Sequence, residues 1–318
     1  MERGGNPDGG RETAARIEAD GGRALFVQAD VSQETLGLTT LGGDTNPNSK
    51  IAQSNGGFLD LVGVVTTASG DVIAVDLENF RLQMFRPGYP GWVQTNINGF
   101  GNPAQGVIST LEVFDDYLYA GTWYGFSQVW RTSDGKNWSQ VTPAWTVTAL
   151  GGGEVFDGAL YLGAYSLHGT VPVGEVWRTD GVTWERVVPD GFGDPTVIWI
   201  NDLVAFNNQL YAVTENIDKN MQIWRSSTGE GVWEQVGAAM LDAVDIRSQK
   251  VLFVYNNQIY LGRSNAGKAE LWHSADGLDW SLVDIPGLGA LNSDISAFAE
   301  FNGSLYVGFR NEVEGGEV

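Results

Sequence analysis

The amino-acid sequence predicts an all-β fold, and three observations carry that prediction. The first is a hairpin motif that returns at intervals along the chain. The second is composition, because 43 Gly, 12 Trp, 10 Tyr and 14 Phe with only 18% charged residues suit many short strands joined by tight turns. The third is the repeat length, which is typical of propeller blades. We therefore predict a β-propeller of about six four-stranded antiparallel blades, the last incomplete, preceded by a short helix-strand segment.

The hairpin motif consists of an aromatic residue, a two-residue turn of Asp, Asn or Gly, and a strand with alternating large apolar side chains. Two turn residues of this type between two apolar runs are a strong signal for a tight β-hairpin. The five clear copies are 114–121, 156–163, 206–213, 255–262 and 301–308. Each copy predicts the first two strands of one unit.

A second hairpin follows the first in each unit. Its leading strand carries a Trp after an apolar residue, as in Val129-Trp130-Arg131, Val176-Trp177-Arg178, Ile223-Trp224-Arg225 and Leu271-Trp272-His273. Its return strand begins near another Trp, at Trp138, Trp184, Trp233 and Trp280. Four strands per unit is the composition of a propeller blade. His273 stands where the other copies have Arg, so we expect it to be a strand residue.

The repeat length is 42 to 50 residues, measured between Tyr119, Tyr161, Tyr211, Tyr260 and Tyr306. This length exceeds that of most solenoid repeats. A weaker copy precedes the others, with strands expected over 61–67, 71–76, 82–86 and 92–95. The sixth unit breaks off at Val318 in mid-strand. We favour a protein that continues beyond this point, and the alternative is a last blade completed by the N-terminal segment, because an open ring leaves an unpaired edge.

Residues 1–34 depart from the repeat and predict a helix, a stop at Gly21-Gly22 and a buried strand. They resemble the part of short-chain dehydrogenases that runs from the second strand to the third, which implies that Asp30 and Val31 are the pair that contacts a cofactor's adenine. A glycine-rich phosphate loop and a Tyr-x-x-x-Lys motif are missing, so we predict no dehydrogenase activity and no cofactor. We interpret 1–34 as an orphan fragment, either native or a fusion artefact, 35–57 as a linker and 58–318 as a propeller truncated at its C-terminus.

The turns that end in the return-strand Trp resemble the Asp box of bacterial neuraminidases, Ser/Thr-x-Asp-x-Gly-x-Thr-Trp. The turns at 132–138 and 274–280 are one residue short of it, 179–184 is shorter, and 226–233 has Thr228 in place of Asp. Such a turn needs an Asp that accepts backbone N–H groups, a Gly with positive φ and a Trp folded over the hairpin. The resemblance covers residues 55–318 and implies a sialidase-type propeller, with these turns away from the ligand face.

Composition excludes several function classes. A net charge of −21 argues against nucleic-acid and anionic-membrane partners. The absence of Cys excludes disulfides, thiolate metal sites and a Cys nucleophile, and two His leave little for a metal centre or a triad. No apolar stretch reaches the ~18 residues of a membrane span, and the first residues lack the apolar region of a signal peptide. We expect a monomer, secreted or on the cell surface if the full gene supplies a signal peptide.

The sequence contains few of the motifs that a sialidase or other glycosidase needs. The sialidase resemblance implies a Phe/Tyr-Arg-Ile-Pro motif and three substrate-binding arginines, but only Phe85-Arg86-Pro87 approaches the motif, and only Arg263 and Arg310 could face a ligand. Glycosidase chemistry needs two carboxylates at a set separation. Candidates in predicted loops are Asp194, Glu215, Asp218 and Asp294, and each is equally suited to a solvated or turn-capping role. We assign no catalytic residue and keep a sialidase-like glycoside hydrolase as the alternative function.

The favoured function is a non-enzymatic binding module for a carbohydrate or protein ligand. Some aromatic residues do not follow the repeat pattern. They gather in the loops that follow the second strand of a blade and beside the connections between blades, where Trp145 also falls. Exposed aromatic side chains stack on sugars or anchor partner proteins, and the alternative is that they pack against neighbouring loops. His168 falls in a long predicted loop over 166–173. The candidate ligand-binding residues are Trp123, Tyr124, Phe126, Tyr165, His168, Trp199, Glu215 and Asp218.

Overall fold

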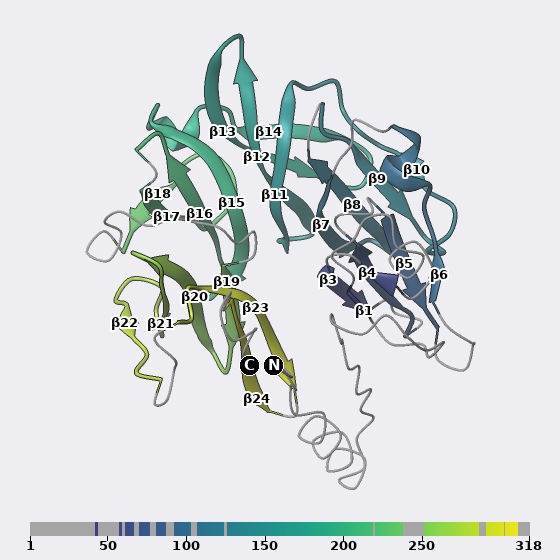
Figure 1. Cartoon of the computed structure of the whole chain (residues 1–318). Helices are drawn as coiled ribbons and strands as arrows, with labels where there is room; N and C mark the ends of the chain where they lie inside the picture. Colours follow the sequence, from purple (N-terminus) through teal and green to yellow (C-terminus); the bar gives the residue numbers. More distant parts are fainter. Residues whose placement is uncertain are drawn as a thin grey trace, which may run out of the picture. The chain divides into compact units, whose positions relative to one another are not determined.

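The computed structural model describes twelve stretches of the chain, which form two compact units (Figure 1). The stretches are 42–43, 57–58, 61–66, 70–76, 81–86, 92–102, 107–123, 126–218, 220–237, 251–285, 291–301 and 303–310. The first unit comprises 1–108 with 135–137, and the second comprises 109–134 with 138–318. The helix-strand segment predicted for 1–34 lies outside the described residues. Within the predicted linker, β1 (Gly42–Gly43) pairs in parallel with β2 (Gly57–Phe58).

The first unit contains one antiparallel sheet whose strands pair in chain order. Its strands are β3 (Leu61–Thr66), β4 (Val72–Asp76), β5 (Arg81–Phe85) and β6 (Trp92–Gln94). They match the four strands predicted from the weak repeat to within one residue at each end. Ile73, Ala74 and Leu82 are fully buried, and because Ile73 and Ala74 are consecutive, both faces of β4 are covered.

The later repeats form sheets of the same kind. The second has β7 (Val107–Phe114), β8 (Tyr117–Trp123), β9 (Val129–Thr132) and β10 (Ser139–Gln140); the third has β11 (Val147–Phe156), β12 (Ala159–His168), β13 (Val171–Thr179) and β14 (Trp184–Val188). The fourth has β15 (Val197–Phe206), β16 (Gln209–Asn216), β17 (Met221–Ser226) and β18 (Glu234–Val236). The fifth has β19 (Leu252–Tyr255), β20 (Gln258–Asn265), β21 (Lys268–Ser274) and β22 (Ser281–Leu282), and the sixth contributes β23 (Asp294–Phe301) and β24 (Ser304–Arg310). Two short 3-10 turns, η1 (Asn98–Gly101) and η2 (Gly191–Gly193), complete the described elements.

The first hairpin of each unit closes through the tight turn that the sequence predicts. In the fourth repeat Asn207 and Asn208 have φ angles of 48° and 55°. Two successive positive φ angles mark a type I′ turn, whose twist matches that of the strands it joins. Asp and Asn tolerate this conformation better than most residues. The same pair of positive φ angles occurs at Asp115-Asp116, Asp157-Gly158 and Asn256-Asn257.

The core of the second unit lies between successive sheets. One cluster joins Tyr211 and Ile223 of the fourth repeat to Leu252 and Leu261 of the fifth. Equivalent clusters join the second repeat to the third, the third to the fourth and the fifth to the sixth. Figure 1 shows β11, β15 and β19, the first strands of three consecutive sheets, following one another in that order. Each sheet therefore buries its faces against its neighbours in the repeat.

Tyrosine side chains mark the joints between these sheets. Tyr161 Oη donates to the carbonyl oxygen of Thr228 at 3.2 Å, and Tyr211 Oη donates to that of Asp276 at 3.3 Å. Each acceptor lies in the turn between the third and fourth strands of the next repeat. Beside them, Gly229 and Gly277 both have a φ of 74°, and a Cβ at either position would collide with the tyrosine ring. Glycine is thus required at these turns both for its backbone conformation and for the close approach of the next sheet.

Turns at this place in the third and fifth repeats are closed internally by carboxylates. Asp276 Oδ1 accepts the backbone N–H groups of Leu278 and Asp279 at 2.8 and 2.9 Å. Asp180 Oδ1 accepts those of Val182 and Thr183 at 2.9 and 2.7 Å. Backbone hydrogen bonds to the charged form lower the pKa of both carboxyl groups below its ordinary value. The turn chemistry predicted at these aspartates is therefore present.

Asp202, in the middle of β15, makes a second kind of joint. Its Oδ2 accepts the N–H groups of Val251 and Leu252 at 2.8 and 2.9 Å, which ties β15 to the fifth repeat. Asp202 is 1% exposed. A Cβ on Gly152 would collide with its carboxylate, so glycine at 152 makes room for this link. A buried carboxylate with this many donors is a structural group.

We predict that the joint between Tyr211 and Gly277 contributes measurably to stability. Gly277→Ala should destabilise the protein by about 2–4 kcal/mol, because a strained φ adds to a collision with Tyr211. Gly267→Ala is the matched control, since Gly267 has a φ of 77° but open space around its Cβ direction. It should cost only about 1 kcal/mol. Denaturant unfolding of both variants measures the difference, and equal losses would contradict the packing role of Tyr211.

Candidate functional site

Three of the predicted ligand-binding residues come together in the structure. The Trp123 and Trp199 rings are 5.0 Å apart between centroids, with planes at 71°. Tyr165 and Trp199 are 6.3 Å apart, with planes at 68°. Both contacts are edge-to-face, a favourable arrangement for aromatic pairs. Trp123, Tyr165 and Trp199, which we call the aromatic cluster, come from three successive repeats and are each partly exposed.

Strand pairing explains how these distant residues meet. Ala149 of β11 lies opposite both Trp123 of β8 and Tyr165 of β12. This bridge also joins the sheets of the second and third repeats into one eight-stranded sheet. Gly174 lies opposite Tyr165, and a Cβ there would be 3.2 Å from the backbone nitrogen of Trp199. The missing side chain at 174 lets β15 bring Trp199 close.

The polar groups of the cluster come from Trp199 and Glu215. The Trp199 Nε1 atom is buried and has no hydrogen-bond acceptor among the described residues. An unsatisfied buried donor costs about 1–3 kcal/mol. Glu215 lies directly opposite Trp199 in the β15–β16 ladder and is partly exposed. The cluster therefore offers aromatic surface with a carboxylate beside it.

The remaining aromatic candidates are less informative. Phe126 is 70% exposed in the segment before β9, and Tyr124 lies outside the described residues. Trp145 belongs to the connection between β10 and β11, as expected. Its Nε1 donates to the carbonyl oxygen of Ser127 at 2.8 Å, and its ring packs against Trp177. Trp145 therefore fills space between elements.

The prediction of a long loop over 166–173 is wrong. Strands β12 and β13 continue to pair through Ser166 opposite Val173 and His168 opposite Val171, so only Gly169 and Thr170 turn. His168 Nε2 is 2.9 Å from Glu175 Oε1. The buried Glu175 carboxylate also accepts from Ser166 Oγ at 2.6 Å, Trp177 Nε1 at 2.9 Å and Arg186 Nη1 at 2.7 Å. His168 thus helps to fix the extended hairpin.

The prediction that all four candidate carboxylates lie in loops is wrong for two of them. Glu215 lies in β16, and Asp294 begins β23 opposite Arg310, because the ladders run further than the repeat pattern indicates. Asp218 does lie in a turn, where it is exposed and its N–H donates to Asn216 Oδ1 at 3.0 Å. Asp194 also lies between strands. Its burial is outweighed by hydrogen bonds from Thr196 and Gln222, which lower its pKa.

Arg263 does not face a ligand. It is 6% exposed, and its Nε and Nη2 atoms are 2.8 and 2.6 Å from Glu270 Oε2. Its guanidinium carbon lies 5.0 Å from the centroid of the Trp272 ring. In the first unit Arg86 pairs with Asp71 through two hydrogen bonds of 2.6 and 2.5 Å. Two of the three arginines singled out near a sialidase pattern, Arg86 and Arg263, therefore have carboxylate partners within the protein.

A polar contact that sequence reasoning missed recurs in four repeats. A Glu or Gln two residues before the strand Trp accepts its indole N–H at 2.9 to 3.2 Å. The signal was present, because the residue at that place is always Glu or Gln. The pairs are Gln128–Trp130, Glu175–Trp177, Gln222–Trp224 and Glu270–Trp272. Glu at this place is thus explained by packing.

Among the described residues, His, Asp and Glu side chains form no group of three or more that could hold a metal ion. The part of the chain that the structure describes also has no helix long and apolar enough to cross a membrane.

Comparison with known proteins identifies the fold. No family model matches the chain, and no curated sequence matches it significantly. A catalytically inactive variant of virginiamycin B lyase from Staphylococcus aureus, solved with quinupristin, is 10% identical with a TM-score of 0.59, over 85% of this chain and 81% of that one. Trypanosoma rangeli sialidase in complex with the inhibitor DANA is 12% identical with a TM-score of 0.52, over 80% of this chain and 53% of that one.

The extracellular domain assigned to a hybrid two-component system of B. thetaiotaomicron is 16% identical with a TM-score of 0.55. The match covers 81% of this chain and 32% of that one, so the chain spans about a third of its length. The chain is a β-propeller. At such low identities the likeness establishes the fold alone. The comparisons give no support to the resemblance of residues 1–34 to short-chain dehydrogenases.

We predict that Glu270 makes stability depend on pH. Burial opposes ionisation of Glu270, but hydrogen bonds from Trp272, Asn265 and Arg263 outweigh it and lower the pKa of the carboxyl group. Its contribution is therefore present above the unfolded pKa of about 4.3 and is lost as pH falls through the folded value.

In Glu270→Gln the free energy of unfolding at neutral pH should drop by about 1–3 kcal/mol. Its fall between about pH 4.3 and pH 3 should also be shallower than in wild type. Gln occupies the same place before Trp130 and Trp224, so the variant retains an acceptor for the indole. Urea unfolding over this pH range is the measurement, and an unchanged slope would refute the prediction.

Proposed function

We propose that this β-propeller is a non-enzymatic binding module that takes a carbohydrate ligand at the aromatic cluster. The observation that carries the proposal is the meeting of Trp123, Tyr165 and Trp199. The repeat does not require these aromatics, because the position of Trp199 is held by Ala149 in the third repeat and by Asp294 in the sixth. Their convergence at one place, while each stays partly exposed, is the pattern expected of a contact surface.

The chemistry of the cluster suits a sugar. Aromatic rings present large apolar faces at low conformational cost, and these complement the C–H faces of a pyranose ring. The Glu215 carboxylate, opposite Trp199 in the ladder, supplies acceptor oxygens for sugar hydroxyls. The acidic surface of the chain, with a net charge of −21, favours a neutral or cationic ligand over an anionic one.

The proposal of a module without catalysis follows from the carboxylates. Hydrolysis by a glycosidase needs a pair of carboxyl groups flanking the bond that breaks. Glu215 is opposite Trp199, but Asp218 lies in an exposed turn capped by Asn216. The buried Glu175 and the partly buried Glu270 both accept hydrogen bonds from internal donors. None of these observations favours the sialidase-like alternative.

Binding measured on a glycan array and then by calorimetry tests this function. Trp199→Ala and Trp123→Ala should each weaken binding of the selected glycan by at least about tenfold, as expected for a central aromatic anchor. Tyr306→Ala is the control, because Tyr306 is also a partly exposed aromatic but lies near the start of β24, at the far end of its blade. Thermal unfolding confirms that the variants remain folded.

Three results would count against the proposal. Glycan affinity that survives both tryptophan substitutions would remove the cluster as the site. Turnover of fluorogenic glycosides by the wild-type chain, abolished in Glu215→Gln, would replace the binding module by an enzyme. Capture of a protein on the same cluster without any glycan binding would replace the carbohydrate by a protein ligand.

A further inference from the structure

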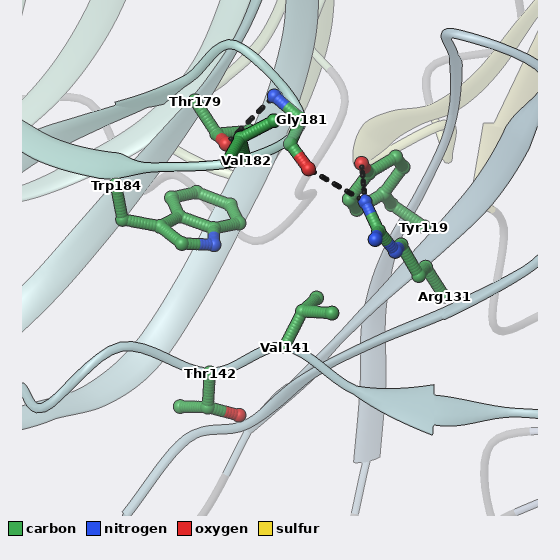
Figure 2. A pocket seen from close by; sticks show the side chains of 8 residues that line it. All are labelled: Tyr119, Arg131, Val141, Thr142, Thr179, Gly181, Val182 and Trp184. Atoms are coloured by element: carbon green, nitrogen blue, oxygen red, sulfur yellow. Dashed lines mark hydrogen bonds between the residues drawn. The ribbon is translucent and has the colours of Figure 1, made fainter.

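A hollow of about 340 Å³ lies between the sheets of the second and third repeats (Figure 2). Tyr119 and Arg131 line it from the second repeat, and Gly181, Val182 and Trp184 line it from the third. Tyr119 precedes Trp123 by four residues in β8, which is about 13 Å along a strand. The hollow is therefore distinct from the aromatic cluster, and its volume is at the small end of the range for small-molecule sites.

Arg131 is the one charged side chain among the described residues that line this hollow. Its Nη1 donates to Tyr119 Oη at 3.0 Å and to the carbonyl oxygen of Gly181 at 2.7 Å. Its guanidinium carbon is 4.4 Å from the centroid of the Tyr117 ring. These partners orient the guanidinium but do not neutralise it. Its Nε and Nη2 atoms have no partner among the described residues.

The equivalent arginines of the next two repeats are neutralised. Arg178 Nε is 3.0 Å from Glu230 Oε1, and Arg225 Nη2 is 2.8 Å from Glu234 Oε2. Glu230 follows the turn glycine of its repeat, and Val182 stands in that place beside Arg131.

The second acidic partner is missing as well. Glu234 lies opposite Arg225 in its ladder, while Ser139 lies opposite Arg131. In a chain with a net charge of −21, the second repeat thus keeps a positive group and omits both carboxylates that pair with it elsewhere.

The other groups around the hollow define what could join Arg131 there. Figure 2 shows Trp184 and Val141 facing the same space as the guanidinium. The threonine hydroxyl groups of the lining are committed, since Thr142 Oγ1 accepts from the N–H of Val129 at 2.9 Å and Thr179 Oγ1 donates to the carbonyl oxygen of Thr183 at 2.6 Å. The Arg131 guanidinium therefore lies beside an apolar surface that includes the Trp184 indole.

We propose that this hollow binds a carboxylate attached to an apolar body. The Nε and Nη2 atoms of Arg131 form the side of the guanidinium that binds carboxylates in a bidentate manner. Trp184 and Val141 cover the apolar part of the ligand. A small organic acid and the C-terminus of a peptide share this chemistry, and the hollow is suited to one carboxylate-bearing unit of either.

The probes are 3-phenylpropionate, a tripeptide that ends in phenylalanine with a free carboxylate, and the amide of each, titrated by calorimetry into the full chain. The acids should bind at least about tenfold more tightly than the amides, because the amides lack the charge-assisted pair. A tripeptide that binds more tightly than the free acid assigns the site to peptide C-termini, and the reverse order assigns it to small acids. Equal binding of acids and amides, or no binding of either acid, overturns the proposal.

The decisive variant adds a carboxylate without removing a contact. Val182→Glu restores the acidic residue that Glu230 supplies in the next repeat, and Val182 is 87% exposed, so the fold is kept. It should weaken binding of the acids by about tenfold or more, because the new carboxylate competes for Arg131.

Val232→Glu is the matched control, with an equally exposed valine and the same added charge in the turn of the next repeat. It should change the affinity by less than about twofold. Equal losses in the two variants would show a general charge effect and overturn the site. Trp199→Ala should leave acid binding unchanged, so this experiment is independent of the proposed function.

Discussion

The joint between a tyrosine of one repeat and a glycine turn of the next is the contact on which the second unit depends. A four-stranded sheet with two apolar faces is not stable alone, since each face must be buried against a neighbour. Tyr161 and Tyr211 fill that space with their rings and end at backbone carbonyls of the next turn. Because Gly229 and Gly277 have no Cβ, the turn and the ring can approach this closely.

This contact recurs between repeats, so a repeat in which it differs is a candidate for a separate role. At Tyr119 the joint includes Arg131, which bonds both the tyrosine and the carbonyl oxygen of Gly181. The acidic groups that accompany Arg178 and Arg225 are missing there. The two proposed sites thus share one feature. At both, residues depart from the pattern that the other repeats follow. They lie toward opposite ends of the strands, which separates their ligands.

Buried carboxylates show why acidity alone says little about catalysis in this chain. Glu175 is 1% exposed and surrounded by donors from four side chains, and Asp202 ties two repeats through backbone N–H groups. The carboxylate oxygens of each accept hydrogen bonds from several donors, which is the condition for burying such a group without a large cost. A catalytic acid needs the opposite environment, one that leaves its charged form poorly solvated.

The sequence by itself determined the strands, the tight hairpin turns and the length of the repeat. These features depend on residues close together in the chain, such as the Asn207-Asn208 pair that prefers positive φ. It also indicated that Trp123, Tyr165 and Trp199 do not belong to the repeat. Only the tertiary structure decided that these three rings meet, that His168 bonds Glu175 in an extended hairpin, and that Arg131 lacks the acidic partner of its counterparts. Such contacts depend on how far ladders extend and how closely sheets approach, and both are set by packing between residues distant in the chain.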